Sequence, residues 1–185
     1  VIEVVETLKK VSILGLVGKK SDLGKKILGY DVIGTDEDLS SLKSECKNVI
    51  VGIGKIGEDN RRNEIINKLI LEGFIFPKII SNYAQVSKFA KVAEGSVIFH
   101  SAIINAEANI GKHCIINTNS IIEHDVSIDD FCHISTGTIV NGNTKIGKNC
   151  FIGSGTIIRE GLDIPCNTVI SAGKRIMGLP LVKKS

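Results

Sequence analysis

The chain has 185 residues, of which 43% are hydrophobic and 23% are charged, with a formal net charge of +3. This composition is typical of a globular protein, and it includes neither a basic, aromatic-rich face for nucleic acid nor an apolar run near the ~18 residues of a membrane span. Five cysteines, an odd number, and the lack of a signal peptide favour reduced thiols and a cytoplasmic location, with no membrane or nucleic-acid partner.

Helical and extended patterns alternate along the first eighty residues. In chain order they predict a helix over 1–10, a strand over 11–18, an irregular stretch, a helix over 36–45, a strand over 48–54, a helix over 60–74 and a strand over 77–80. Because apolar runs bounded by glycine and separated by helices indicate a parallel sheet, residues 1–80 are expected to form a Rossmann-like subdomain. Ligands bind beyond the carboxyl ends of such strands, which here are Gly18–Lys19 and Gly52–Lys55. The first is a binding segment or merely a turn, and in the second Gly52 and Gly54 are the candidate substrate contacts.

A strict six-residue period replaces this pattern over residues 81–185. Every sixth residue from Val86 to Ile176 is Val or Ile, and the residue four positions after each is mostly small. Gly, Asn or Asp often stands three positions after, as a tight corner with positive φ requires. A fixed period with one large and one small inward residue predicts a parallel β-helix of hexapeptides, in which residues eighteen apart stack at roughly 4.8 Å.

Stacking arranges the outward strand residues in three columns, one on each face of a triangular prism. The first column is polar and consists of Lys91, Asn109, Ser127, Lys145 and Asp163. The second consists of isoleucines: Ile103, Ile121, Ile139 and Ile157. The third is mostly apolar and consists of Val97, Ile115, His133, Phe151 and Val169. Two apolar faces indicate self-association, for which closed threefold packing is one solution. The alternative is that the isoleucines only reflect β-propensity.

Cys114, Cys132 and Cys150 are also eighteen residues apart, but at the small inward position. We therefore expect them to pack in an internal column. A linear buried stack does not offer the convergent tetrahedral geometry of a zinc site, so no metal is predicted.

His124 differs from the other histidines because it follows the isoleucine column at a corner and is flanked by Glu123 and Asp125. At the edge of a subunit cleft, its imidazole would act as a general base on an incoming amine or hydroxyl. Asp125 would orient the imidazole, or would only satisfy the turn. Glu123 is expected to be solvated, as are His100 and His113, whereas His133 lies within an apolar face.

The stretch "IIEHDVSIDDFCHISTGTIVNGNTKIGKNCFIG" after a small α/β domain resembles bacterial hexapeptide acyltransferases of the sialic acid O-acetyltransferase and bacillosamine-pathway N-acetyltransferase group. The resemblance covers nearly the whole chain and is strongest from Val86 to Gly178. It supplies the left hand of the β-helix and implies a homotrimer, with acetyl-CoA held between adjacent β-helices. Members usually begin with a strand and a Gly-rich loop, and we expect this chain to start after both.

The resemblance assigns the catalytic base to His124 and its neighbouring acid to Asp125. The implied cofactor contacts are His133, Asn117, Gly142, Ser154 and Ala172. Four basic residues near the end would meet the coenzyme's phosphates or be merely solvated: Lys174, Arg175, Lys183 and Lys184.

The predicted activity is direct acetyl transfer from acetyl-CoA to the amino group of a nucleotide-linked amino sugar, without a metal. Nearby amides or His133 would stabilise the oxyanion. Sialic acid O-acetylation and a non-catalytic trimeric scaffold or sugar-binding module are the alternatives.

Overall fold

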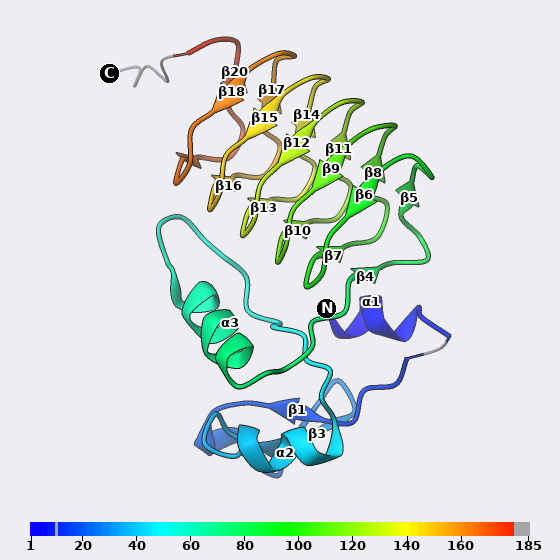
Figure 1. The fold of residues 1–185 in the computed structure, drawn as a ribbon, viewed down its shortest axis with the longest axis vertical. Helices are drawn as coiled ribbons and strands as arrows, with labels where there is room; N and C mark the ends of the chain where they lie inside the picture. Colours follow the sequence, from blue (N-terminus) through cyan, green and yellow to red (C-terminus); the bar gives the residue numbers. More distant parts are fainter. Residues whose placement is uncertain (10, 180–185) are drawn as a thin grey trace.

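The computed structural model describes residues 1–9 and 11–179, which form a small α/β half followed by a triangular parallel β-helix (Figure 1). The β-helix expected from the six-residue period is confirmed, whereas the sheet within residues 1–80 is not the parallel sheet that was expected. Within the described residues, no helix is long and apolar enough to cross a membrane.

In its described residues, the α/β half contains three helices, one 3-10 turn and a three-stranded sheet of order β1-β3-β2. Its elements are α1 (Ile2–Glu6), β1 (Leu16–Val17), η1 (Lys20–Asp22), β2 (Lys26–Ile27), β3 (Tyr30–Gly34), α2 (Leu39–Glu45) and α3 (Arg61–Leu71). Strands β1 and β3 are parallel, whereas β2 and β3 are antiparallel, so the sheet is mixed. The strand expected over 48–54 is not formed, because only Asn48 in that segment makes a β-bridge, to Ile75.

The β-helix consists of two-residue strands in three parallel sheets. Sheet 1 contains β4 (Ile79–Ile80), β7 (Val97–Ile98), β10 (Ile115–Ile116), β13 (His133–Ile134), β16 (Phe151–Ile152) and β19 (Val169–Ile170). Sheet 2 contains β5 (Gln85–Val86), β8 (Ile103–Ile104), β11 (Ile121–Ile122), β14 (Ile139–Val140), β17 (Ile157–Ile158) and β20 (Arg175–Ile176). Sheet 3 contains β6 (Lys91–Val92), β9 (Asn109–Ile110), β12 (Ser127–Ile128), β15 (Lys145–Ile146) and β18 (Asp163–Ile164).

The predicted register is confirmed throughout, since strands pair with partners eighteen residues away, as Ile121 does with Ile139. We call the turns from sheet 1 to sheet 2 the first corner, those from sheet 2 to sheet 3 the second corner, and those from sheet 3 to sheet 1 the third corner. Every sixth residue from Gly95 to Gly173 has positive φ. The backbone therefore turns at the position that the sequence predicted for Gly, Asn or Asp.

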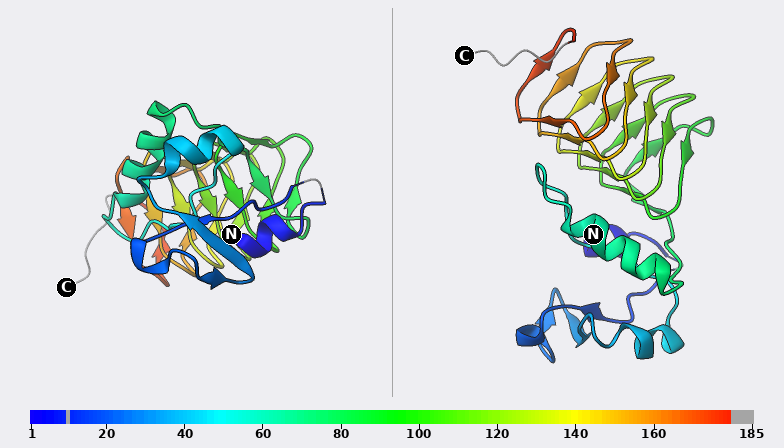
Figure 2. Two further views of the ribbon diagram at one scale, coloured as in Figure 1. Left: turned by 90° about the horizontal axis from the view of Figure 1, so that it is seen from below. Right: turned by 60° about the vertical axis from the view of Figure 1, so that its left-hand side comes forward.

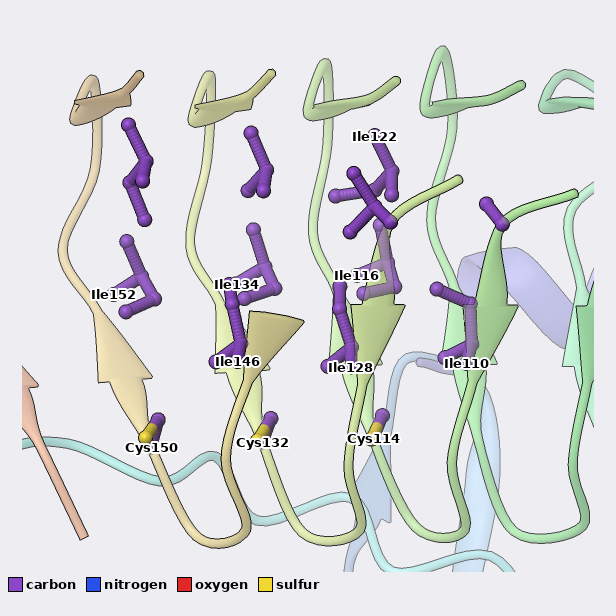
Figure 3. Packing of buried hydrophobic residues seen from close by; sticks show 14 of the residues in the cluster. Ile110, Cys114, Ile116, Ile122, Ile128, Cys132, Ile134, Ile146, Cys150 and Ile152 are labelled. Carbon is purple, nitrogen blue, oxygen red and sulfur yellow. The ribbon is translucent and has the colours of Figure 1, made fainter. Parts of the chain in front are cut away.

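The inward isoleucines and the small residues form one continuous core, in which Cys114, Cys132 and Cys150 stack in a column (Figure 3). Each thiol donates to a backbone carbonyl fifteen residues ahead, as Cys132 does to Gly147 at 3.1 Å. Ser120 and Thr138 use their hydroxyls in the same way. The neighbouring Cys114 thiol and burial raise the pKa of Cys132, so the column is structural, as predicted.

The α/β half covers part of sheet 1 and the third corner (Figure 2). Val4 and Val5 of α1 pack with Ile79 and Val97 of sheet 1. Helix α3 packs on the third corner, where the Arg62 Nη1 donates to the His113 carbonyl at 2.8 Å. The apolar column of sheet 1, predicted to associate with another subunit, is therefore buried at Val97, Ile115 and His133, and the chain's own N-terminal half contributes to that cover.

His113 was expected to be solvated, and this prediction is wrong. The residue is only 3% exposed, and its ring makes an edge contact to Phe76 and a stacked contact to Phe131. Burial lowers its pKa. The hexad position placed the residue at a corner correctly, but it carried no information about which corner the N-terminal half would cover.

We predict that Ile134→Ala lowers the free energy of unfolding by about 2–5 kcal/mol, because Ile134 is fully buried and the coils above and below it cannot collapse into the cavity. The measurement is urea unfolding followed by circular dichroism at one protein concentration. Lys145→Ala on the exposed face of sheet 3 is the control, with a change of about 0.5 kcal/mol or less. Equal losses in the two variants would contradict the assigned core.

Candidate active site

A groove of ≈ 400 Å³ lies on the second corner. Its lining residues are Glu123, His124, Asn141, Gly142, Asn143, Glu160 and Gly161. Because positions 124, 142 and 160 share one hexad register, His124, Gly142 and Glu160 occupy successive coils of one ladder along the prism. Gly142, the middle member of this ladder, has no side chain.

The imidazole of His124 is paired with the carboxylate of Asp125, whose Oδ2 lies 2.8 Å from Nδ1. A carboxylate accepts a hydrogen bond, so in the neutral imidazole Nδ1 carries the hydrogen and Nε2 has the free lone pair. Asp125 also occupies the positive-φ position of its corner, with φ 60°. The two interpretations of this residue are therefore compatible: its backbone makes the turn and its side chain contacts His124.

Gly142 forms the seat of the imidazole. A Cβ at this position would lie 2.7 Å from Cε1 and 2.8 Å from Nε2 of His124. The ring thus lies directly over the bare backbone of the next coil. A side chain at position 142 would displace it.

Glu123 is less solvated than predicted. It is half-buried, and its Oε2 accepts a hydrogen bond of 2.8 Å from Nδ2 of Asn105 in the preceding coil. Glu123, Asn141 and Glu160 were not singled out as site residues from the sequence. Their hexad positions relative to His124 could have identified them, since outward residues of adjacent coils at one corner must be neighbours.

The other predicted cofactor contacts lie away from this groove. Asn117, Ser154 and Ala172 lie on the first corner, where Ser154 and Ala172 are on adjacent coils and the Ser154 carbonyl accepts from the amide of Gly173 at 2.8 Å. Ser154 Oγ is 2.8 Å from Ser135 Oγ. Of the predicted cofactor contacts, only Gly142 lies beside His124, because the strands of sheet 2 separate the two corners.

His133 lies in sheet 1 and is only 7% exposed. Its Nδ1 is 2.6 Å from the carbonyl of Lys55, and its Nε2 is 3.3 Å from Nδ2 of Asn117. Burial lowers the pKa of His133. The contact with Lys55 also shows that the loop containing Gly52 and Gly54, both exposed, crosses the β-helix beside this histidine.

No group of His, Cys, Asp and Glu side chains in the described part of the chain has the arrangement of a metal site. Of the basic residues near the end, Lys174 and Arg175 are exposed. Lys183 and Lys184 lie outside the described residues.

We predict that Gly142→Ala displaces the His124 ring while leaving the β-helix intact, because the added methyl group overlaps the ring but fits a corner with ordinary φ. A crystal structure of the variant measures the displacement. Gly178→Ala is the matched control, since a Cβ there meets no atom within 4 Å. An unmoved His124 ring in Gly142→Ala would show that the ring does not lie over position 142.

No family model matches the chain, and no curated protein matches it at the significance required. Solved structures do. The acetyltransferase domain of PglB from Neisseria gonorrhoeae, in complex with acetyl coenzyme A, has 29% identity and a TM-score of 0.84, covering 94% of this chain and 84% of that chain.

A second similar structure is a histidine mutant of perosamine N-acetyltransferase from Caulobacter crescentus with CoA and GDP-perosamine. It has 28% identity and a TM-score of 0.78 and covers 85% of this chain and 74% of that chain. WeeI from Acinetobacter baumannii shares the fold at 22% identity, with a TM-score of 0.68 over 89% of this chain and 82% of that chain. The predicted resemblance to hexapeptide-repeat sugar acetyltransferases is confirmed by these neighbours.

Proposed function

We propose that the chain transfers the acetyl group of acetyl-CoA to the amino group of a nucleotide-linked amino sugar, with His124 as general base. The observation that carries the proposal is the His124–Asp125 pair, seated over Gly142 in an open groove. The neighbours support the choice of reaction, because one contains acetyl coenzyme A and another CoA with GDP-perosamine.

The carboxylate of Asp125 keeps the hydrogen on Nδ1 of His124 and leaves Nε2 free to take a proton. Acetyl-CoA supplies a thioester whose acyl carbon accepts an amine nucleophile. As the new C–N bond forms, His124 Nε2 removes a proton from the attacking nitrogen. When the C–S bond breaks, His124 returns that proton to the leaving sulfur, and Asp125 stabilises the imidazolium in between.

The structure supports direct transfer rather than an acyl-cysteine intermediate. Cys114, Cys132 and Cys150 are buried in the core, where burial and neighbouring thiols raise the pKa of Cys132 and Cys150. A thiol with a raised pKa has little thiolate, which is the nucleophilic form. The groove itself contains no cysteine.

We assign the coenzyme contacts to Asn117, His133, Ser154 and Ala172 of sheet 1 and the first corner and to Gly142 of the second corner. In one chain these two sets face different directions, with sheet 2 between them. A site that uses both sets must therefore be assembled from two copies of the chain.

The assembly that we propose is a homotrimer. Ile103, Ile121, Ile139 and Ile157 form a partly exposed stripe on sheet 2, between the two corners. If sheet 2 faces a threefold axis, the second corner of each copy meets the first corner of the next, and three copies form a closed ring. Burial of the stripe supplies the driving force.

Residues 1–80 are assigned to the nucleotide-sugar, with Gly52 and Gly54 as backbone contacts, and residues 81–185 to acetyl transfer. Both glycines are exposed and leave open space around their Cα atoms. The loop that contains them also supplies the carbonyl that contacts His133. We place the reaction in the cytoplasm, which agrees with the five free thiols.

We predict that His124→Ala lowers kcat for acetyl transfer by about 10²–10⁴-fold, because the variant has no general base at the groove. Asp125→Asn causes a smaller loss, and Asp163→Asn on the exposed sheet 3 is its matched control. Thiol release from acetyl-CoA is measured against GDP-linked and UDP-linked amino sugars and sialic acids. Unchanged rates in His124→Ala would remove the assigned base, and faster turnover of sialic acids would replace the acceptor.

The inter-subunit site predicts complementation between two inactive chains. His124→Ala lacks the base on the second corner, whereas Asn117→Ala lacks a contact on the first. If they are unfolded and refolded together, some interfaces combine two intact corners, so activity is regained above that of either variant alone. A mixture no more active than its components, or light scattering that gives a monomer near 19.9 kDa, would contradict a site shared between copies.

A further inference from the structure

Each hydrogen bond around His133 has only one possible direction, and these directions determine whether His133 can donate to a ligand. A backbone carbonyl can only accept, so the 2.6 Å contact with Lys55 requires the hydrogen on Nδ1 of His133. The amide N–H of Thr118 can only donate, and it lies 2.8 Å from Oδ1 of Asn117. The Asn117 side chain therefore turns its Nδ2 toward His133 Nε2, at 3.3 Å.

The charges around His133 oppose its protonation. Burial lowers its pKa, the Lys55 carbonyl acts in the opposite sense, and the Arg62 and Lys55 cations lower it further. The ring of Phe151 lies edge-on at 5.3 Å on the next coil of sheet 1, and Ile115 lies on the preceding coil. Neither neighbour provides a negative charge, so His133 is neutral near pH 7.

A neutral imidazole has one donor and one acceptor, and both are used here. His133 therefore has no N–H left for a ligand. The Nδ2 group of Asn117 has two hydrogens and makes one hydrogen bond within the described residues. Asn117 is partly exposed on the first corner, so its second N–H can donate a hydrogen bond to a ligand there.

The loop that provides the Lys55 carbonyl is fixed through the lysine side chain. Lys55 is only 3% exposed, and its Nζ donates to Oδ1 of Asn149 at 2.6 Å and to Oδ1 of Asn60 at 3.5 Å. Asn149 belongs to the third corner of the β-helix, whereas Asn60 directly precedes α3. The lysine thus holds its own backbone carbonyl against sheet 1.

We propose that Asn117 is the catalytic residue that donates to the thioester oxygen, and that His133 and Lys55 are positioning residues that hold its amide in place. The proposal rests on the proposed acetyl transfer, in which negative charge develops on that oxygen. An oriented N–H in a subunit interface would stabilise this charge. The role of His133 differs from the one expected from the sequence, where nearby amides or His133 itself were the candidate oxyanion donors.

The first test requires no activity. Long-range ¹H–¹⁵N spectra of the histidine-labelled chain report the tautomer of His133, assigned with a His133→Gln variant. We expect hydrogen on Nδ1 alone, from pH 8 down to below the ordinary imidazole pKa of about 6.5. Hydrogen on Nε2 at pH 7.5, or titration at or above that pKa, would overturn the proposed hydrogen-bond direction whether or not the chain transfers acetyl groups.

The second test separates the donor from its support. Asn117→Asp replaces the N–H groups with an acceptor, so we expect kcat to fall by about 10²–10³-fold with KM for acetyl-CoA changed by less than about threefold. The same change should raise the pKa of His133 in the spectra, since Nε2 then faces a carboxylate. Asn109→Asp on the solvated face of sheet 3 is the matched control.

Lys55→Met keeps the length of the side chain but removes its hydrogen bonds to Asn149 and Asn60. We expect a mixed tautomer signal for His133 and a kcat reduced less than in Asn117→Asp, whereas exposed Lys145→Met changes neither. Full activity in Asn117→Asp would refute the donor role. An unchanged His133 signal in a folded Lys55→Met chain would refute the role of Lys55.

Discussion

The β-helix depends on one repeated constraint: each hexad must bury an aliphatic side chain and then turn the backbone at positive φ. Every sixth residue from Gly95 to Gly173 meets the second requirement, including residues such as His113, Asp125 and Phe131 that have side chains. The constraint fixes the register of all three sheets, and therefore fixes which outward side chains become axial neighbours. The position of the His124 ring is a direct consequence, because the ring can lie over position 142 of the next coil only when that residue has no side chain.

The N-terminal half adds what a uniform prism cannot provide, which is a covered face. Arg62 and Lys55 are both buried, and among the described residues they bond to carbonyl or amide oxygens instead of carboxylates. Burial lowers the pKa of Arg62 to about 10, so it remains charged at neutral pH. Such groups are costly to bury, and their hydrogen bonds are specific in direction. They therefore fix α3 and the Lys55 loop against particular coils, including the coil of His133.

The local features of the β-helix could be predicted because they repeat. The inward isoleucines, the cysteine column, the corners and the neighbourhood of His124 and Asp125 all follow from position within a hexad. Contacts between the halves could not be predicted in this way. His113 and the apolar column of sheet 1 were assigned to solvent or to a subunit interface, since the hexad position does not indicate where α1 and α3 pack.

The strand expected over 48–54 failed for a related reason. Its composition is that of a buried strand, and Val51 is indeed buried, but a strand also requires a hydrogen-bonded neighbour. Within 48–54 the pairing is limited to the single bridge of Asn48 with Ile75, where the amide of Val49 donates to the Ile75 carbonyl at 2.9 Å. The hydrophobic pattern thus predicted the burial of Val51, whereas the pairing of the segment depends on other segments.

The exposure of the His124–Asp125 pair explains why a neighbouring copy matters for chemistry as well as for geometry. In the single chain, His124 and Asp125 have side-chain exposures of 65% and 56%, so water competes for both groups and screens their interaction. A first corner docked against this second corner would exclude that water and strengthen the attraction between imidazolium and carboxylate. The same docking would bring the Asn117 N–H to the groove. Oligomerisation would therefore bring the base and the oxyanion donor together in a low-dielectric environment. A single prism cannot do this because its corners point apart.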